Sequence, residues 1–88
     1  MMFKASHILV RHEYEAKDIL KKIADGKSFE DLAKDFSQCP SSKNGGMLGE
    51  FPTGKMVPAF EKALIALKPG EVSGIVKTQF GHHIILRH

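Results

Sequence analysis

The chain has 88 residues, which is enough for one domain with a small core and too few for two. Hydrophobic residues make up 42% and charged residues 26%, which indicates a folded globular domain and excludes a disordered chain. The single cysteine, Cys39, excludes an intramolecular disulfide scaffold and favours a reducing compartment. The 13 basic and 10 acidic residues are interspersed, so the net charge of +3 comes without a basic stripe for nucleic acid.

The first half of the chain predicts one strand and two helices. Residues 4–10 end in the apolar run Ile8-Leu9-Val10 and predict a strand. Residues 13–25 place apolar side chains at helical spacing, and Gly26 ends that helix. Ser28 has the character of an N-cap for a second helix, which runs through Phe36. The turn-rich segment 37–46 predicts a loop, with room for a short helical turn after Pro40.

The second half predicts three strands and one more helix. The helix starts at Pro58, a residue that suits a first helical turn, and Lys68-Pro69-Gly70 stops it. The strands are 47–51, 71–77 (weakened by Gly74) and 82–87. The element order βααβαββ predicts an α+β domain whose sheet is mainly antiparallel, with helices packed around it.

Two histidines occupy matching places on the first and last strands. Because strand side chains alternate between faces, His7 shares a face with Leu9, and His83 shares a face with Ile85. If these strands are neighbours, the two imidazoles meet over the sheet. A single strand histidine is more often structural, so the pair by itself gives only modest support for a site.

Cys39 lies in the loop after the second helix, where a lone cysteine is most often a small packed residue. A cysteine near histidines also suggests a nucleophile or a zinc ligand. The local signatures of cysteine proteases are absent, as is any CxxC pair or compact Cys/His spacing. We therefore expect no metal site.

Several apolar residues are candidates for a binding surface rather than for the core. Met56 and Phe60 are four residues apart around Pro58, and Phe80 lies in a predicted turn, where packing explains a large apolar residue less easily. Leu48 and Phe51 flank the Gly49-Glu50 step and can join the same wall. None of these residues alone identifies an enzyme.

Taken together, five motifs in order resemble the parvulin family of peptidyl-prolyl cis/trans isomerases over essentially the whole chain. They are Ser6-His7-Ile8-Leu9-Val10; Phe29-xx-Leu32-Ala33-xx-Phe36-Ser37; Gly45-Gly46-Met47-Leu48-Gly49-Glu50-Phe51; Gly54-Lys55-Met56-Val57-Pro58-Ala59-Phe60-Glu61; and Gly70-Glu71-Val72-Ser73 followed by Thr78-Gln79-Phe80-Gly81-His82-His83-Ile84-Ile85.

The resemblance implies one domain over residues 1–88 with a parvulin-like (FKBP-like) α+β fold, a four-stranded antiparallel sheet surrounded by about four helices. It implies an enzyme that accelerates rotation about X-Pro bonds and assists protein folding without a cofactor. The residues that match the catalytic positions are His7, Cys39, Thr78 and His83, and those that match the substrate-binding positions are Leu48, Phe51, Met56, Phe60 and Phe80. We expect the histidines to form a hydrogen-bond network with Cys39 and Thr78.

Two positions depart from the family pattern. Met47 stands where many members have aspartate after the paired glycines, so a local polar contact is lost. The link Arg11-His12-Glu13-Tyr14-Glu15 is short, whereas phosphate-directed members carry a longer loop with clustered basic residues. A phosphoserine would find no bidentate basic clamp here and two nearby carboxylates. We therefore predict an isomerase that does not require phosphorylation and prefers a neutral or apolar residue before proline.

The expected partners are proline-containing peptides and unfolded or partly folded proteins. A non-catalytic peptide-binding or chaperone module on the same fold is the main alternative, and a nucleic-acid binder is a weaker one. No segment approaches the roughly 20 apolar residues of a membrane span, and residues 1–7 lack a secretory pattern. We accordingly expect a cytoplasmic monomer without membrane contact.

Overall fold

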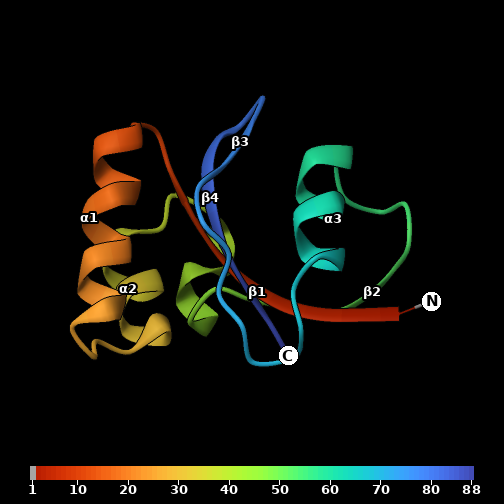
Figure 1. Cartoon of the computed structure of the whole chain (residues 1–88), viewed down its shortest axis with the longest axis horizontal. Coiled ribbons are helices and arrows are strands. Elements are labelled where there is room, and N and C mark those ends of the chain that lie inside the picture. The colour runs from red at the N-terminus through yellow and green to blue at the C-terminus, as the bar shows by residue number, and fades with distance from the viewer. Residues whose placement is uncertain (1) are drawn as a thin grey trace.

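The computed structural model describes residues 2–88, except for the side chain of Ser41. Its elements are β1 (Met2–Val10), α1 (Glu13–Ala24), α2 (Phe29–Phe36), the 3₁₀ helix η1 (Pro40–Asn44), β2 (Met47–Pro52), α3 (Pro58–Ile65), β3 (Val76–Thr78) and β4 (Gly81–Arg87). The expected α+β class, with an antiparallel sheet wrapped by helices, is confirmed (Figure 1).

The four strands form one antiparallel sheet in the order β2-β1-β4-β3. The first and last long strands of the chain are therefore neighbours at its centre. In their register His7 lies opposite Ile85, and Leu9 lies opposite His83. This pairing, which connects residues almost 80 positions apart, brings the two predicted histidines to the same place on the sheet.

The alternation of β1 and β4 builds a separate core on each face of the sheet. On one face Ile8, Val10 and Ile84 are almost fully buried and pack with α1 and α2. On the other face, Phe3 and Ile85 pack against α3. Figure 1 shows the same division, with α1 and α2 on one side of the strands and α3 on the other. The sheet thus separates the face covered by α1 and α2 from the face that carries α3 and the histidines.

Helix starts follow local rules that the sequence displays. Ser28 accepts a hydrogen bond from the backbone N–H of Asp31 and caps α2 as predicted. Pro58 occupies the first turn of α3, where its missing N–H costs nothing. The Glu15 carboxylate accepts from the backbone N–H of His12 at the start of α1.

None of the helices within residues 2–88 is long and apolar enough to cross a membrane.

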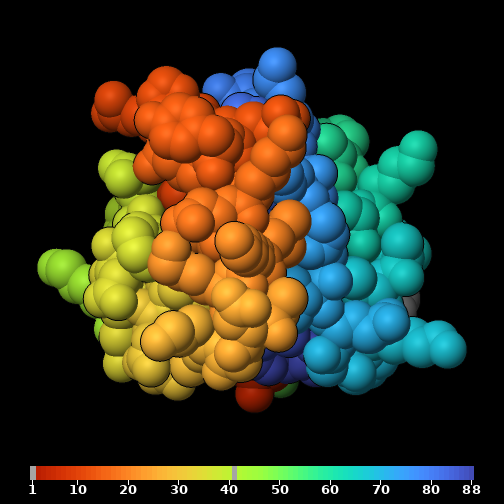
Figure 2. Space-filling view, turned by 60° about the vertical axis from the view of Figure 1, so that its left-hand side comes forward, coloured from red at the N-terminus to blue at the C-terminus, as the bar shows by residue number. Residues whose placement is uncertain are grey.

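The predicted strand 71–77 is wrong in extent. Only Val76–Thr78 pairs regularly with β4, and before it only Val72 forms an isolated bridge, to Leu86. The Ser73 N–H donates to the Ile85 carbonyl, but the Ile85 N–H donates to the Ser73 hydroxyl, so a side chain takes one of the two ladder bonds there. The segment leading into β3 instead runs over the surface between α1 and α3 (Figure 2).

Candidate active site

The two strand histidines meet on the α3 face of the sheet. Their rings stack with centroids 5.2 Å apart and an interplanar angle of 19°. Both are buried, with 6% of His7 and 4% of His83 exposed. Phe60 of α3 presents its ring edge-on to both imidazoles, at 5.6 and 5.5 Å. The histidines are therefore held between the sheet and one aromatic side chain of the helix.

A chain of hydrogen bonds runs through the pair. His7 Nδ1 lies 3.0 Å from His83 Nδ1, and His83 Nε2 lies 2.7 Å from Thr78 Oγ1. The Phe80 N–H donates to Thr78 Oγ1, which leaves the Thr78 hydroxyl proton for His83. In the tautomers that fit this order, His83 carries its proton on Nδ1 and donates it to His7. The proton of His7 then sits on Nε2.

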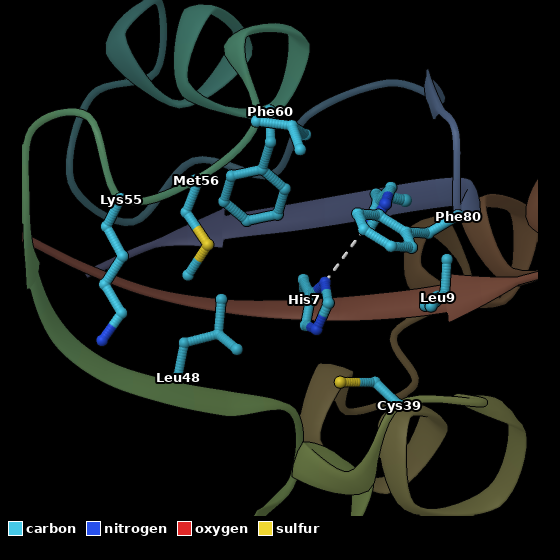
Figure 3. A pocket seen from close by; sticks show the side chains of 10 residues that line it. His7, Leu9, Cys39, Leu48, Lys55, Met56, Phe60 and Phe80 are labelled. Carbon is cyan, nitrogen blue, oxygen red and sulfur yellow. Dashed lines mark hydrogen bonds between the residues drawn. The ribbon is translucent and has the colours of Figure 1, made fainter.

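His7 Nε2 is buried and has no hydrogen-bond partner among the described residues. In Figure 3 the edge of His7 away from the dashed bond is directed toward Cys39. A buried polar atom without a partner is costly in a folded protein and is commonly a sign of function. His7 Nε2 is thus an unsatisfied polar group within the histidine pair.

Both imidazoles are neutral at neutral pH. Burial, with a smaller contribution from the neighbouring His83, lowers the pKa of His7 to about 4. Burial also lowers the pKa of His83, with a smaller contribution from His82. A proton added to either ring would place a positive charge in an apolar site beside the second imidazole, which can also become positively charged. The pair therefore serves as hydrogen-bonding groups rather than as charges.

Above the histidines lies an apolar pocket of about 400 Å³. Figure 3 shows its side chains gathered around His7 and Phe60. Its lining residues are His7, Leu9, Cys39, Leu48, Lys55, Met56, Val57, Phe60, Phe80 and His83. The volume suits a ring the size of proline with its flanking backbone, and the walls offer mainly carbon to it.

A bulge in β2 aims Leu48 into this pocket. Ala5 pairs with Gly49, but the next residue, Ser6, pairs with Met47, so Leu48 is the extra residue. Gly49 has φ +74°, a conformation that glycine adopts without strain. The sequence predicted Leu48 in the pocket, and the bulge explains how a short edge strand presents it.

Cys39 reaches the pocket because its loop is tied to β1. The Gln38 N–H donates to the Leu9 carbonyl, and the Leu9 N–H donates to Ser37 Oγ. Within the described residues, however, no hydrogen bond joins the Cys39 thiol to either histidine. The hydrogen-bond network therefore includes Thr78 but omits Cys39.

Phe51, which the resemblance matches to a substrate-binding position, does not line the pocket. Phe51 is 1% exposed and packs against Phe3 in the core on the α3 side, outside the pocket lining. Thr78 likewise does not line the pocket and acts through His83. Sequence reasoning missed Leu9, Lys55 and Val57. Leu9 was signalled by its alternation with His7, and the other two by their adjacency to Met56.

Among residues 2–88, no three His, Cys, Asp or Glu side chains are grouped so that they could hold a metal ion. His82 points to the opposite face from His83 and contacts the Arg11 carbonyl. An apolar peptide-sized pocket above two neutral histidines, on an antiparallel α+β domain, defines the class of the protein as a proline-peptide isomerase.

The comparisons with known proteins agree with this class. The family model "Rotamase: PPIC-type PPIASE domain" matches residues 7–88, and the chain therefore belongs to this family, the parvulins. It is 54% identical over 83 residues to the foldase protein PrsA of Geobacillus kaustophilus, which covers 93% of the chain and 30% of that relative. The chain thus spans less than a third of the length of such curated relatives.

Solved structures show the same fold. The peptidylprolyl isomerase PrsA from Bacillus anthracis aligns with a TM-score of 0.96 and 50% identity, over 98% of this chain and 40% of that one. NmPin, the parvuline of Nitrosopumilus maritimus, aligns with a TM-score of 0.86 and 46% identity, over 98% and 94%. The parvulin fold and the peptidyl-prolyl isomerase class expected from the five motifs are confirmed.

Proposed function

We propose that this chain isomerises X-Pro bonds in unfolded or partly folded proteins without requiring phosphorylation, and so assists their folding. The observation that carries the proposal is the apolar pocket of Leu48, Met56 and Phe60 lying directly above the neutral pair His7 and His83. The relatives named foldases support folding chains as clients.

The physical task is to lower a rotational barrier. An X-Pro bond favours trans by only about 0.5–1 kcal/mol, yet amide resonance opposes rotation with a barrier near 20 kcal/mol. The catalyst must bind the twisted amide better than either planar form. No covalent step is needed.

The pocket residues can do this by holding one side of the bond still. The proline ring packs among the apolar walls while the preceding carbonyl turns. Low polarity disfavours the planar amide, which is more dipolar than the twisted one. The unpartnered His7 Nε2–H is buried beneath the pocket, so it donates to peptide backbone only if binding opens a path to it. His83 and Thr78 hold that proton on Nε2 through the hydrogen-bond chain.

Phosphate independence is supported by the charges near the first loop. Arg11 is followed by Glu13 and Glu15, and Glu13 is paired with Lys17 on α1. No pair of guanidinium groups is available to clamp a dianion.

The cytoplasmic location and the monomeric state stay predictions. Fractionation of cells measures the first, and sedimentation measures the second.

The test is exchange spectroscopy by two-dimensional NMR, without a coupled protease, on Ala-Pro, Leu-Pro, Glu-Pro and phosphoserine-Pro peptides with substoichiometric protein. Exchange cross-peaks that appear with protein for the unphosphorylated peptides are the expected result. Binding shifts without exchange would instead establish the alternative, a peptide-holding module that lacks turnover. Exchange confined to phosphoserine-Pro would overturn the phosphate independence.

A further inference from the structure

One lysine lines the otherwise apolar pocket. Lys55 is exposed and lies with Met56 and Leu48 at the end of the pocket away from Phe80 (Figure 3). Because both histidines are neutral, its ammonium group is the charged group of the described lining at neutral pH. A proline ring requires only apolar contacts, so the isomerisation described above leaves this charge without a role.

The backbone that carries Lys55 is tied down on both sides. The Lys55 N–H donates to the Pro52 carbonyl and closes a tight turn. Within that turn, the Gly54 N–H donates to the Glu61 carboxylate of α3. The lysine stem therefore starts from a fixed point at the pocket rim, while its exposed ammonium group stays free to meet a ligand.

No carboxylate of the described residues neutralises Lys55. Glu61, six residues along the chain, already accepts the Gly54 N–H, and Glu50 lies on β2 opposite Lys4. The ion pairs found within residues 2–88 all lie along α1 and α2: Glu13–Lys17, Asp18–Lys22 and Glu30–Lys34. An unneutralised cation at one end of an apolar groove favours a ligand with a negative charge beside an apolar group.

We propose that Lys55 is a specificity-determining residue that favours substrates with Asp or Glu adjacent to the proline, on the side of the peptide lying over Leu48 and Lys55. This inference rests on the proposed function and departs from the expected preference for neutral residues. One exposed ammonium group gives a modest and salt-sensitive preference, because water screens the pair. It does not create the multidentate clamp that a phosphate requirement needs.

The test compares matched peptides: Glu-Pro-Ala with Gln-Pro-Ala, and Ala-Pro-Glu with Ala-Pro-Gln. Affinity is measured by chemical-shift titration and turnover by exchange spectroscopy. In one of the two pairs, we expect the Glu peptide to bind about two- to five-fold more tightly than its Gln partner at low salt. Raising the salt to about 0.5 M should remove most of that difference. The variant Lys55→Glu should reverse it.

The control is Lys27→Glu, which changes the net charge equally at an exposed lysine outside the pocket. It should keep the preference. Equal affinities for Glu and Gln peptides in both pairs would overturn the proposal, as would a preference that survives in Lys55→Glu or disappears in Lys27→Glu. Binding without exchange would refute the isomerase while the Glu-to-Gln ratio still decides the role of Lys55. Failure of every peptide to bind would overturn both.

Discussion

Cys39 lines the pocket, yet its thiol forms no hydrogen bond with the histidines in the described part of the chain. Rotation about an amide needs no nucleophile, so we expect Cys39→Ser and Cys39→Asp both to retain substantial exchange activity. The rate is measured by the same NMR exchange experiment, with the amide spectrum as the check that the fold is intact. Loss of turnover in both variants, with the spectrum unchanged, would contradict this view of Cys39.

Met56 offers the cleanest test of the pocket wall. It is half-buried and lines the pocket. Met56→Ala should weaken peptide binding by about 1–3 kcal/mol, from the apolar contact that it removes. Ile65→Ala is the control, because Ile65 is 54% exposed on α3 outside this pocket. Phe60→Ala is less informative: Phe60 is 2% exposed, so its truncation also costs about 3–5 kcal/mol of folding free energy.

The burial of His7 makes stability depend on pH. Its pKa is about 4 in the folded chain and about 6.5 when unfolded. Between these values only the unfolded state binds the proton, so the free energy of unfolding falls as pH falls, by about 2 kcal/mol between pH 6.5 and 5. The contribution becomes constant only about one unit above pH 6.5, where the unfolded histidine has also lost its proton.

Urea unfolding at several pH values measures the slope. His7→Phe removes this titrating group while keeping an aromatic ring, so it should reduce the slope over pH 5–6.5, where carboxylates stay largely ionised; the slope that remains comes from His83, whose pKa burial also lowers. The same slope in the variant and the parent would show that His7 is not the group responsible.

At the scale of elements, the turn into β2 depends on a close approach of three segments. Gly46 has φ +83°, and a Cβ there would lie 2.4 Å from the His7 carbonyl oxygen and 3.1 Å from Ala33 Cβ of α2. The Gly46 carbonyl also accepts the His7 N–H at 2.9 Å. The glycine therefore lets β1, α2 and β2 meet beside His7.

Gly46→Ala should destabilise the fold by about 1–3 kcal/mol from backbone strain alone, with the clash adding to this. Gly74→Ala is the matched control, because a Cβ there meets nothing within 4 Å and φ lies outside the left-handed region. Denaturant unfolding compares the two. If both variants lose the same stability, close packing at Gly46 is not the cause.

At the scale of the whole molecule, two cores share one sheet. The core against α1 and α2 and the core against α3 both include residues of β1 and β4. Neither can persist when these central strands separate, so the domain should unfold in one step. Phe51→Ala, in the α3 core only, should lower the thermal midpoint of amide signals from both cores equally. Different midpoints for the two sets of amides would contradict a single cooperative unit.

Much of this molecule is determined locally and can be derived from the sequence. Alternation along β1 and β4 places His7 and His83 on defined faces, Ser28 starts α2, and Pro58 starts α3. These features depend on a residue and its near neighbours, so the pattern of the chain is enough to predict them. The structure brings Leu48, Met56, Phe60 and Phe80, which the motif resemblance matched to substrate-binding positions, to one pocket.

Other features depend on which distant segments become neighbours, and only the tertiary structure decides them. Phe51 and Phe60 are both aromatic and lie close in sequence to the pocket residue Met56. The register of β2 nevertheless places Phe51 in the core, outside the pocket. The Ser73 side chain takes one bond of a strand ladder, and among the described residues the Cys39 thiol forms no hydrogen bond with either histidine. Lys55 enters the pocket through a turn anchored to α3. In each case long-range packing and hydrogen bonding decide where the side chain lies. Local sequence preferences alone allow it to lie either in the core or at the pocket, and either paired or unpaired.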